Sequence, residues 1–204
     1  MKNLFHSVAG AVERCKAFIV SVFAVYAVTC LLGIIMVHGG NRFAMAQRDR
    51  IVGAAIEKSI ISKHYMEGDR FAAAVLDFGG NLFLGAVPQT VLGLGIVLPY
   101  FSIAYQGWVG GIVSMDSLHG SRLDHLKTAL YYFITIILQL IAYSFAIGPG
   151  IRLGLETYKG NLHKRLKEFR IDKTGLKDVL LAYVLVIPLF FLASCFEFLS
   201  NWNT

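Results

Sequence analysis

The chain has 204 residues, of which 56% are apolar and only 16% are charged, and its net charge is +6. A typical globular domain is about 45–50% apolar and about 25% charged. The composition therefore excludes an ordinary water-soluble domain and indicates the lipid bilayer as the solvent. The length fits one integral membrane domain over residues 1–204, and the basic charge, which lies between apolar blocks, favours membrane topology over nucleic-acid binding.

The first predicted span covers residues 17–37, whose 21 residues carry no charge. About 20 residues are needed to cross the hydrocarbon core. The following sequence, VHGGNRF, is not a cleavage site of small residues, so we interpret the block as a retained helix and not as a signal peptide. Residues 44–66 then mix charged and apolar residues at helical spacing, which predicts an amphipathic helix outside the bilayer core.

Residues 71–115 form an apolar region that glycines, prolines and amides interrupt. As one continuous helix this region would extend roughly 67 Å, about twice the thickness of the hydrocarbon core. We therefore predict two spans, 71–91 and 94–115, with a tight turn near residues 89–95. The alternative is one long crossing followed by a shorter re-entrant piece near the sequence YQGWVGG.

The fourth predicted span covers residues 128–147. We expect Gly148, Pro149 and Gly150 to end it, because these residues extend a regular helix poorly, and Arg152 to reach the lipid headgroups. Residues 156–170 form a basic amphipathic segment, which is either a helix on the membrane surface or a plain topology signal. The fifth predicted span covers residues 179–196.

The predicted fold is all-α: a polytopic transmembrane helix bundle of about five spans, with broken Gly/Pro-rich helices. Placing the N-terminus inside gives 11 Lys and Arg residues to the inner segments and 8 to the outer segments. Because inner loops are enriched in these residues, we expect a cell-membrane protein with a cytoplasmic N-terminus and an external C-terminus.

Polar side chains within the spans are the first candidate site residues. Asp77 is either an ion or proton site or an interfacial residue that is hydrogen-bonded to a neighbouring helix. Amides such as Asn81 commonly join helices by hydrogen bonds. Thr135 and Gln139 are four residues apart and share one helix face, and we expect Gln139 to meet Asn81 or Gln106 inside the bundle.

Glycines form the second group of candidates. The patterns Gly107-x-x-x-Gly111 and Gly150-x-x-x-Gly154 allow two helix backbones to approach closely. The apolar region is therefore predicted to make dense helix–helix contacts whose register is set by polar pairs, although a transport pathway would use the same residues. The sequence contains no G-x-S-x-G, P-loop or H-E-x-x-H motif, so we expect no enzyme activity, cofactor or metal.

Several of these residues carry a resemblance to the stage II sporulation protein M family of membrane proteins. Asn81 stands where the family has an asparagine, Gln106-Gly107 where it has Asn-Gly, and GIRLG, which ends at Gly154, where it has Gly-(Leu/Ile)-Arg-Leu-Gly. Thr135 and Gln139 fall on the family's His-Gly-x-x-Glu pair, and Glu197 on a closing glutamate. Both members of that pair are uncharged here, which puts proton or metal chemistry in doubt for this chain.

The resemblance implies a five-span inner-membrane protein. The sporulation member of the family anchors a complex that remodels the cell envelope with peptidoglycan hydrolases. We therefore expect a non-enzymatic scaffold or anchor for a membrane or envelope complex. Its expected partners are the lipid bilayer, other membrane or envelope proteins, or a second copy of the chain. The alternative is a small membrane transporter or a channel subunit.

Overall fold

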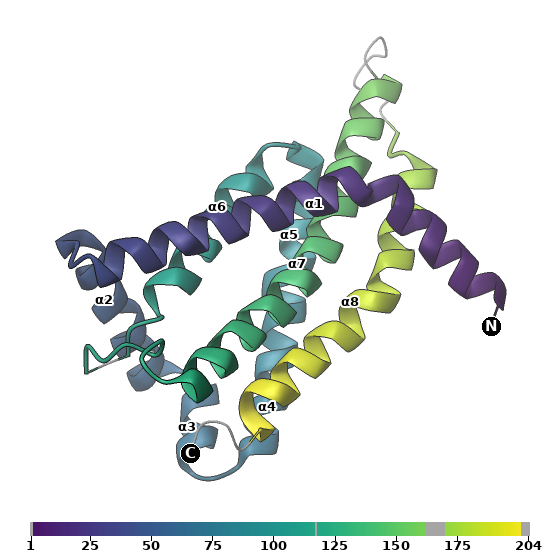
Figure 1. Ribbon diagram of the computed structural model, residues 1–204. Helices are drawn as coiled ribbons and strands as arrows, with labels where there is room; N and C mark the ends of the chain where they lie inside the picture. The colour runs from purple at the N-terminus through teal and green to yellow at the C-terminus, as the bar shows by residue number, and fades with distance from the viewer. Residues whose placement is uncertain (1, 117, 162–169, 201–204) are drawn as a thin grey trace.

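The computed structural model describes residues 2–116, 118–161 and 170–200, and the elements in these ranges are helical (Figure 1). Four helical segments are long and apolar enough to cross a membrane: Leu4–His38, Arg70–Gly95, Leu126–Asn161 and Lys173–Leu199. The prediction of an all-α fold is thus confirmed, and the four segments indicate a multi-pass membrane protein in contact with the bilayer.

Helix α1 (Lys2–His38) contains the first predicted span and is followed by two short helices. Asn41 caps α2 (Arg42–Lys58) by accepting a hydrogen bond from the backbone of Ala44. The single amphipathic helix predicted over residues 44–66 is wrong, because Ser59 has an extended backbone, with ψ at 122°, and caps a separate helix, α3 (Ile60–Met66). A serine hydroxyl that satisfies the first amides of a helix favours a new start at that point.

The second apolar segment is continuous from Arg70 to Gly95. It consists of α4 (Arg70–Gly79), the π-helical turn η1 (Gly80–Ala86), α5 (Val87–Leu92) and the short 3₁₀ turn η2 (Gly93–Gly95). The chain reverses after η2, at Ile96, whose φ is +56°. The turn therefore falls at the end of the predicted range, residues 89–95. Pro88 does not end the helix earlier, because it lies in the first turn of α5, where a missing N–H costs little.

Helix α6 (Leu98–Ile112) has 15 residues, or roughly 22 Å, which is shorter than the hydrocarbon core of about 30 Å. It lies beside α1 and runs in the same direction. The Tyr100 hydroxyl is 2.6 Å from that of Ser21, and Ser114, just after α6, is 3.1 Å from His38 at the end of α1. The predicted span 94–115 is thus not among the four segments that are long and apolar enough to cross, and the helix that follows the long Arg70–Gly95 segment is a shorter one.

Helix α7 (Leu126–Asn161) continues through Pro149 for 36 residues, so the prediction that the Gly-Pro-Gly sequence ends this helix is wrong. Both glycines of this sequence lie at close helix contacts, Gly148 against Ile19 and Gly150 against Thr90. Helices within a bundle tolerate such residues because packing against neighbours offsets the weaker local helix. The basic segment predicted over residues 156–170 coincides with the end of α7 up to Asn161, and residues 162–169 lie outside the described part.

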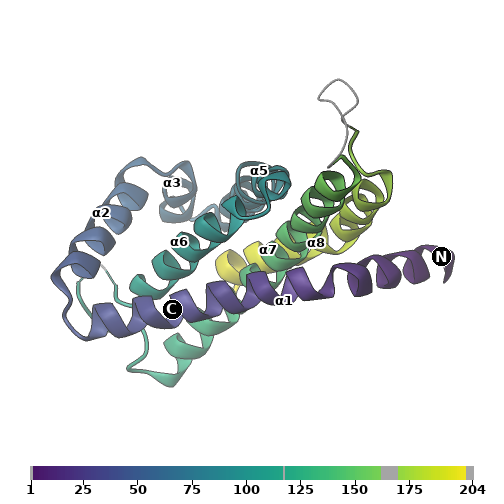
Figure 2. The same ribbon diagram turned by 90° about the horizontal axis from the view of Figure 1, so that it is seen from above.

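Helix α8 (Lys173–Leu199) begins at the N-cap Asp172 and contains Pro188. Figures 1 and 2 show α7 and α8 side by side, with α1 laid obliquely across them. Contacts at both ends of the pair, Arg152 with Asp178 and Gln139 with Glu197, show that α7 and α8 are antiparallel.

An apolar cluster lies near the middle of the bundle, beside the buried hydrogen bonds of Thr90 with the backbone of Ala146 and the hydroxyl of Tyr183. It contains Val22 of α1, Ile147 of α7, and Val186 and Phe190 of α8, and each of these side chains is 0% exposed. Because lipid tails are as apolar as these side chains, this layer stabilises helix association by close packing and not by transfer out of water. It also separates two polar clusters that lie toward opposite ends of the helices.

Candidate functional site

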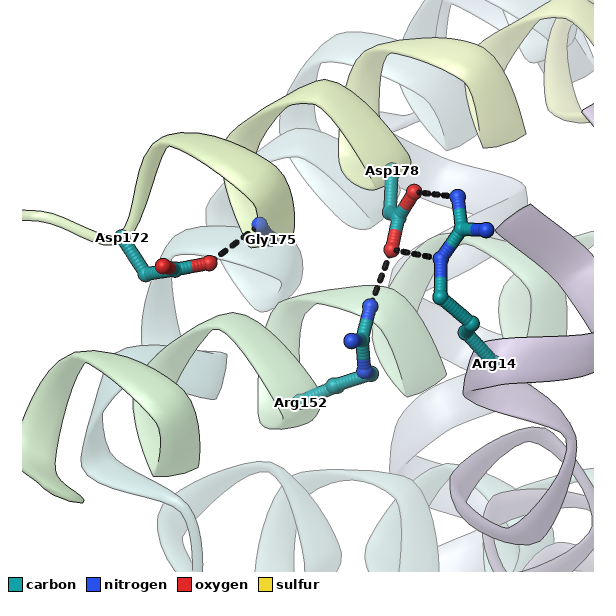
Figure 3. Close-up of polar contacts among 5 residues, drawn as sticks. All are labelled: Arg14, Arg152, Asp172, Gly175 and Asp178. Carbon is teal, nitrogen blue, oxygen red and sulfur yellow. Dashed lines mark hydrogen bonds and ion pairs between the residues drawn. The ribbon is translucent and has the colours of Figure 1, made fainter. Parts of the chain in front are cut away.

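The first polar cluster joins three helices through one carboxylate. Asp178 of α8 is 1% exposed and contacts Arg14 of α1 and Arg152 of α7 (Figure 3). Arg14 donates from Nε to Oδ2 over 3.0 Å and from Nη2 to Oδ1 over 2.5 Å, and Arg152 donates from Nη1 to Oδ2. We call these three residues the Asp178 cluster.

Arg152 was predicted to reach the lipid headgroups, but its side chain is only 15% exposed and is paired with Asp178. The reason is the continuation of α7 through Pro149, which places Arg152 on a helix turn that faces α8. Sequence reasoning missed Asp178. The available signal was an acid just before the last apolar block and a base just after the preceding block, on the same predicted side of the membrane.

The four candidate glycines lie at backbone contacts between helices. A Cβ atom at Gly107 would lie 2.5 Å from the carbonyl oxygen of Tyr26, and one at Gly111 would lie 2.9 Å from Cα of Gly33. In the same way, a Cβ at Gly150 or Gly154 would overlap the backbone of residues 90–94. The glycines therefore join α6 to α1, and α7 to the α5–η2 segment, as small-residue patterns do in other bundles.

The second polar cluster lies toward the other end of the helices. Asp77 Oδ2 accepts hydrogen bonds from Asn81 Nδ2 over 2.9 Å and from Ser194 Oγ, on α8, over 2.7 Å. Asn81 Oδ1 accepts from the hydroxyl of Tyr143, on α7, over 2.9 Å. We call these four residues the Asn81 cluster. Asp77 is thus hydrogen-bonded to the neighbouring helix α8, as expected if it is an interfacial residue.

Gln139 and Glu197 form a neighbouring polar contact between α7 and α8. Gln139 Nε2 donates to Glu197 Oε2 over 2.9 Å, and the Tyr131 hydroxyl donates to the backbone oxygen of Glu197 over 2.6 Å. Gln139 was expected to meet Asn81 or Gln106, but its hydrogen bond goes to Glu197 instead. The Gln139 amide donates and the Glu197 side chain accepts, so this hydrogen bond joins α7 to α8.

A cavity of about 790 Å³ connects these side chains. Five of the residues singled out in the sequence line it, and these come from η1, α6, α7 and α8: Asn81, Gln106, Thr135, Gln139 and Glu197. The exposed Arg122 and Lys127 lie at its edge, in and just after the loop between α6 and α7. A volume of this size is typical of a small-molecule site.

Sequence reasoning missed the tyrosines of this cavity. Six of the nine tyrosines in the chain line it: Tyr26, Tyr65, Tyr105, Tyr131, Tyr132 and Tyr143. They lie on α1, α3, α6 and α7, so no spacing along the chain relates them. Only the packing of these helices brings the rings to one place.

Two polar atoms in the cavity wall stand out. Within the described part of the chain, Gln106 Oε1 and Thr135 Oγ1 are buried and have no hydrogen-bond partner. Thr135 is only 8% exposed. Because a buried polar group without a partner costs free energy, these atoms mark the cavity as a place for a ligand with hydrogen-bond donors.

One stability prediction follows from the Asn81 cluster. Tyr143→Phe removes the hydroxyl that Asn81 accepts from, and we expect it to lower the free energy of unfolding by about 1 kcal/mol. Tyr158→Phe, at a side chain that is 61% exposed, should leave stability unchanged within about 0.5 kcal/mol. Reversible unfolding in mixed micelles measures the free energy of unfolding of both variants. An equal loss of stability in the two would contradict a stabilising role for the hydrogen bond from Tyr143 to Asn81.

Comparison with known proteins adds no identification to this geometry. No protein-family model, no curated protein and no solved structure matches the chain. The two polar clusters and the cavity are therefore the basis for any statement of function.

Proposed function

We propose that the chain crosses the membrane five times, with α6 as a short fifth span beside the four long segments. The directions of the helices support this proposal, since α1, α6 and α8 run one way and the α4–α5 segment and α7 run the other. Together with the distribution of Lys and Arg residues, this order favours a cytoplasmic N-terminus and an external C-terminus. The Asp178 cluster then lies toward the inner face and the cavity toward the outer face.

The function that this geometry favours is that of a non-enzymatic scaffold or anchor for a membrane or envelope complex. The observation that carries the proposal is the apolar layer around Val22, Ile147, Val186 and Phe190, all fully buried, between the two polar regions. Close backbone contacts at Gly107 and the other candidate glycines hold the helices on either side of it. A bundle closed in this way is better suited to holding partners in place than to conducting solutes.

Membership of the stage II sporulation protein M family is part of the same proposal. Its support is that five of the positions that carry the resemblance line one cavity: Asn81, Gln106, Thr135, Gln139 and Glu197. Gly107 and the GIRLG segment do not line it. Residues that a family shares are expected to gather at one site when that site has a common role. The family's envelope partners suggest where to look for partners of this chain.

The test is affinity purification of the tagged chain from native membranes after chemical cross-linking, with mass spectrometry of the captured material. We expect at least one other membrane or envelope protein in a reproducible ratio to the chain, with cross-links to defined lysines. An unrelated multi-pass protein with the same tag serves as the control. If the purification yields this chain alone, or the same proteins as the control, the scaffold proposal is rejected.

The cavity also supports a second candidate, a small transporter or channel subunit. Opening the apolar layer would join the cavity to the inner face, as alternating access requires. If this candidate is right, liposomes that contain the pure protein move a solute, and Asp77→Asn or Gln139→Leu lowers the flux at least about tenfold. Flux that is unchanged in both variants would remove these residues from the pathway.

A further inference from the structure

We propose that the cavity is a binding site for a zwitterionic ligand. The primary ammonium group of the ligand lies against Glu197, Gln106 and Thr135, and its anionic group meets Arg122 and Lys127. This is the chemistry of a phosphoethanolamine group, either free in solution or as a lipid headgroup. The inference goes beyond the proposed function and does not depend on a protein partner.

The deep part of the cavity favours a ligand that donates hydrogen bonds. Three of the donors that line it are already used within the protein, since Gln139 Nε2 bonds to Glu197, Asn81 Nδ2 to Asp77 and the Tyr143 hydroxyl to Asn81. The hydroxyl of Tyr132 likewise donates to the backbone oxygen of Gly110 over 2.6 Å. These four donors are therefore available to a ligand only if a hydrogen bond within the protein is broken.

The acceptors are of the kind that an ammonium group recognises. Glu197 contributes a carboxylate, which only accepts while it is ionised, and Gln106 Oε1 and Thr135 Oγ1 are buried without a partner in the described part of the chain. An ammonium group has three N–H donors and one positive charge. Its three donors equal these three acceptors in number, and its positive charge complements the Glu197 carboxylate when that group is ionised.

The tyrosine rings add to this preference. Tyr26, Tyr132 and Tyr143 line the cavity and are 5%, 4% and 8% exposed. The faces of buried tyrosine rings attract cations, more strongly where water is excluded. A cationic group in the deep part of the cavity would thus have aromatic surface beside the carboxylate.

The edge of the cavity has the opposite charge. Arg122 and Lys127 line it and are both exposed, and guanidinium and ammonium groups are the usual partners of phosphate oxygens in proteins. The Asp116 side chain, also at this edge, accepts hydrogen bonds from the backbone of Leu118 and Gly120 over 2.9 and 2.8 Å. These bonds hold Asp116 within its own loop.

The test uses the full chain in a maltoside detergent and isothermal titration with O-phosphoethanolamine. We expect saturable binding, and binding at least about tenfold weaker for phosphocholine, whose methylated nitrogen cannot donate, and for glycerol phosphate, which has no ammonium group. A second arm measures lipid retention by native mass spectrometry, with phosphatidylethanolamine and phosphatidylcholine of the same acyl chains. If the chain prefers phosphatidylethanolamine to phosphatidylcholine but does not distinguish the soluble compounds, the ligand is a lipid headgroup. If it prefers only O-phosphoethanolamine among the soluble compounds, the ligand is a free solute.

Matched variants separate the binding site from the fold. Glu197→Gln should weaken binding about 10–100-fold and Thr135→Val about tenfold. Thr135→Val should do so without loss of thermal stability, because its Oγ1 has no partner in the described chain. Asp124→Asn, an exposed acid outside the cavity, should bind as the unaltered chain does. Equal binding of the ethanolamine and choline compounds, full affinity in Thr135→Val, or no binding in either arm would overturn the proposal.

Discussion

Replacing Asp178 with Asn is expected to lower the free energy of unfolding by about 3–5 kcal/mol. Asp178 is 1% exposed and neutralises Arg152, whose side chain is 15% exposed. The variant would leave that guanidinium buried without a counter-charge. An uncompensated charge inside a bundle costs several kcal/mol because neither water nor lipid can stabilise it.

The two arginines should contribute unequally. The side chain of Arg14 is 45% exposed, so solvent screens its attraction to Asp178, and Arg14→Gln should cost only about 1 kcal/mol. Combining Asp178→Leu with Arg152→Met should recover most of the loss, since apolar pairs of similar volume often replace buried ion pairs without penalty. This recovery would show that the penalty comes from the unpaired charge and not from lost volume.

Equilibrium unfolding in mixed micelles, with helix content as the signal, measures these differences. Glu156→Gln is the matched control, because Glu156 forms an ion pair with Lys159 near the same end of α7, with side chains 38% and 59% exposed. It should change stability by no more than about 0.5 kcal/mol. If Asp178→Asn is as mild as this control, the Asp178 cluster does not hold the bundle together.

Replacing Gly111 with Leu should cost about 3 kcal/mol or more. A Cβ at this position would overlap the carbonyl oxygen of Cys30 and lie 2.9 Å from Cα of Gly33 and the amide nitrogen of Ile34. Because all three are backbone atoms, no side-chain rotation can relieve the overlap, and α6 must move away from α1. The same movement would widen the cavity, which α6 lines with Gln106.

Gly79→Ala provides the matched control for this variant. Gly79 lies in α4, and apart from its chain neighbours and the nearby backbone of its own helix, no atom lies within 4 Å of a Cβ built there. Alanine should therefore raise stability by about 0.5–1 kcal/mol, because it loses less backbone entropy on folding. The unfolding measurement used for Asp178 applies to both variants. A Gly111→Leu protein as stable as the unaltered chain would contradict the close α1–α6 contact.

The class of protein could be predicted from composition and block length alone. A run such as residues 17–37 is long enough and apolar enough to cross a bilayer whatever its neighbours are, and this is a local property. The candidate residues could also be chosen from the sequence, because a polar group such as Asn81 within an apolar span needs a partner. Neither step depended on knowing which helices are adjacent.

The breaks in the helices could not be placed in this way. Pro149 lies in the middle of α7, whereas Ser59, a residue with no strong breaking tendency, separates α2 from α3. Local propensity predicted the reverse for both positions. In a bundle, contacts such as that of Gly148 with Ile19 offset a weak helix former, so tertiary packing determines where a helix ends.

The amino-acid sequence by itself determined that this chain is a helical membrane protein and that amides within its spans, such as Asn81 and Gln139, need partners, since both follow from the transfer of side chains and peptide groups out of water. Only the tertiary structure decided the partners. Gln139 bonds to Glu197, Arg152 to Asp178, and tyrosines from four helices surround one cavity. The physical reason is that hydrogen bonds and ion pairs act over a few ångströms, and helix rotation and crossing, set by the whole apolar core and its glycines, determine which groups come that close.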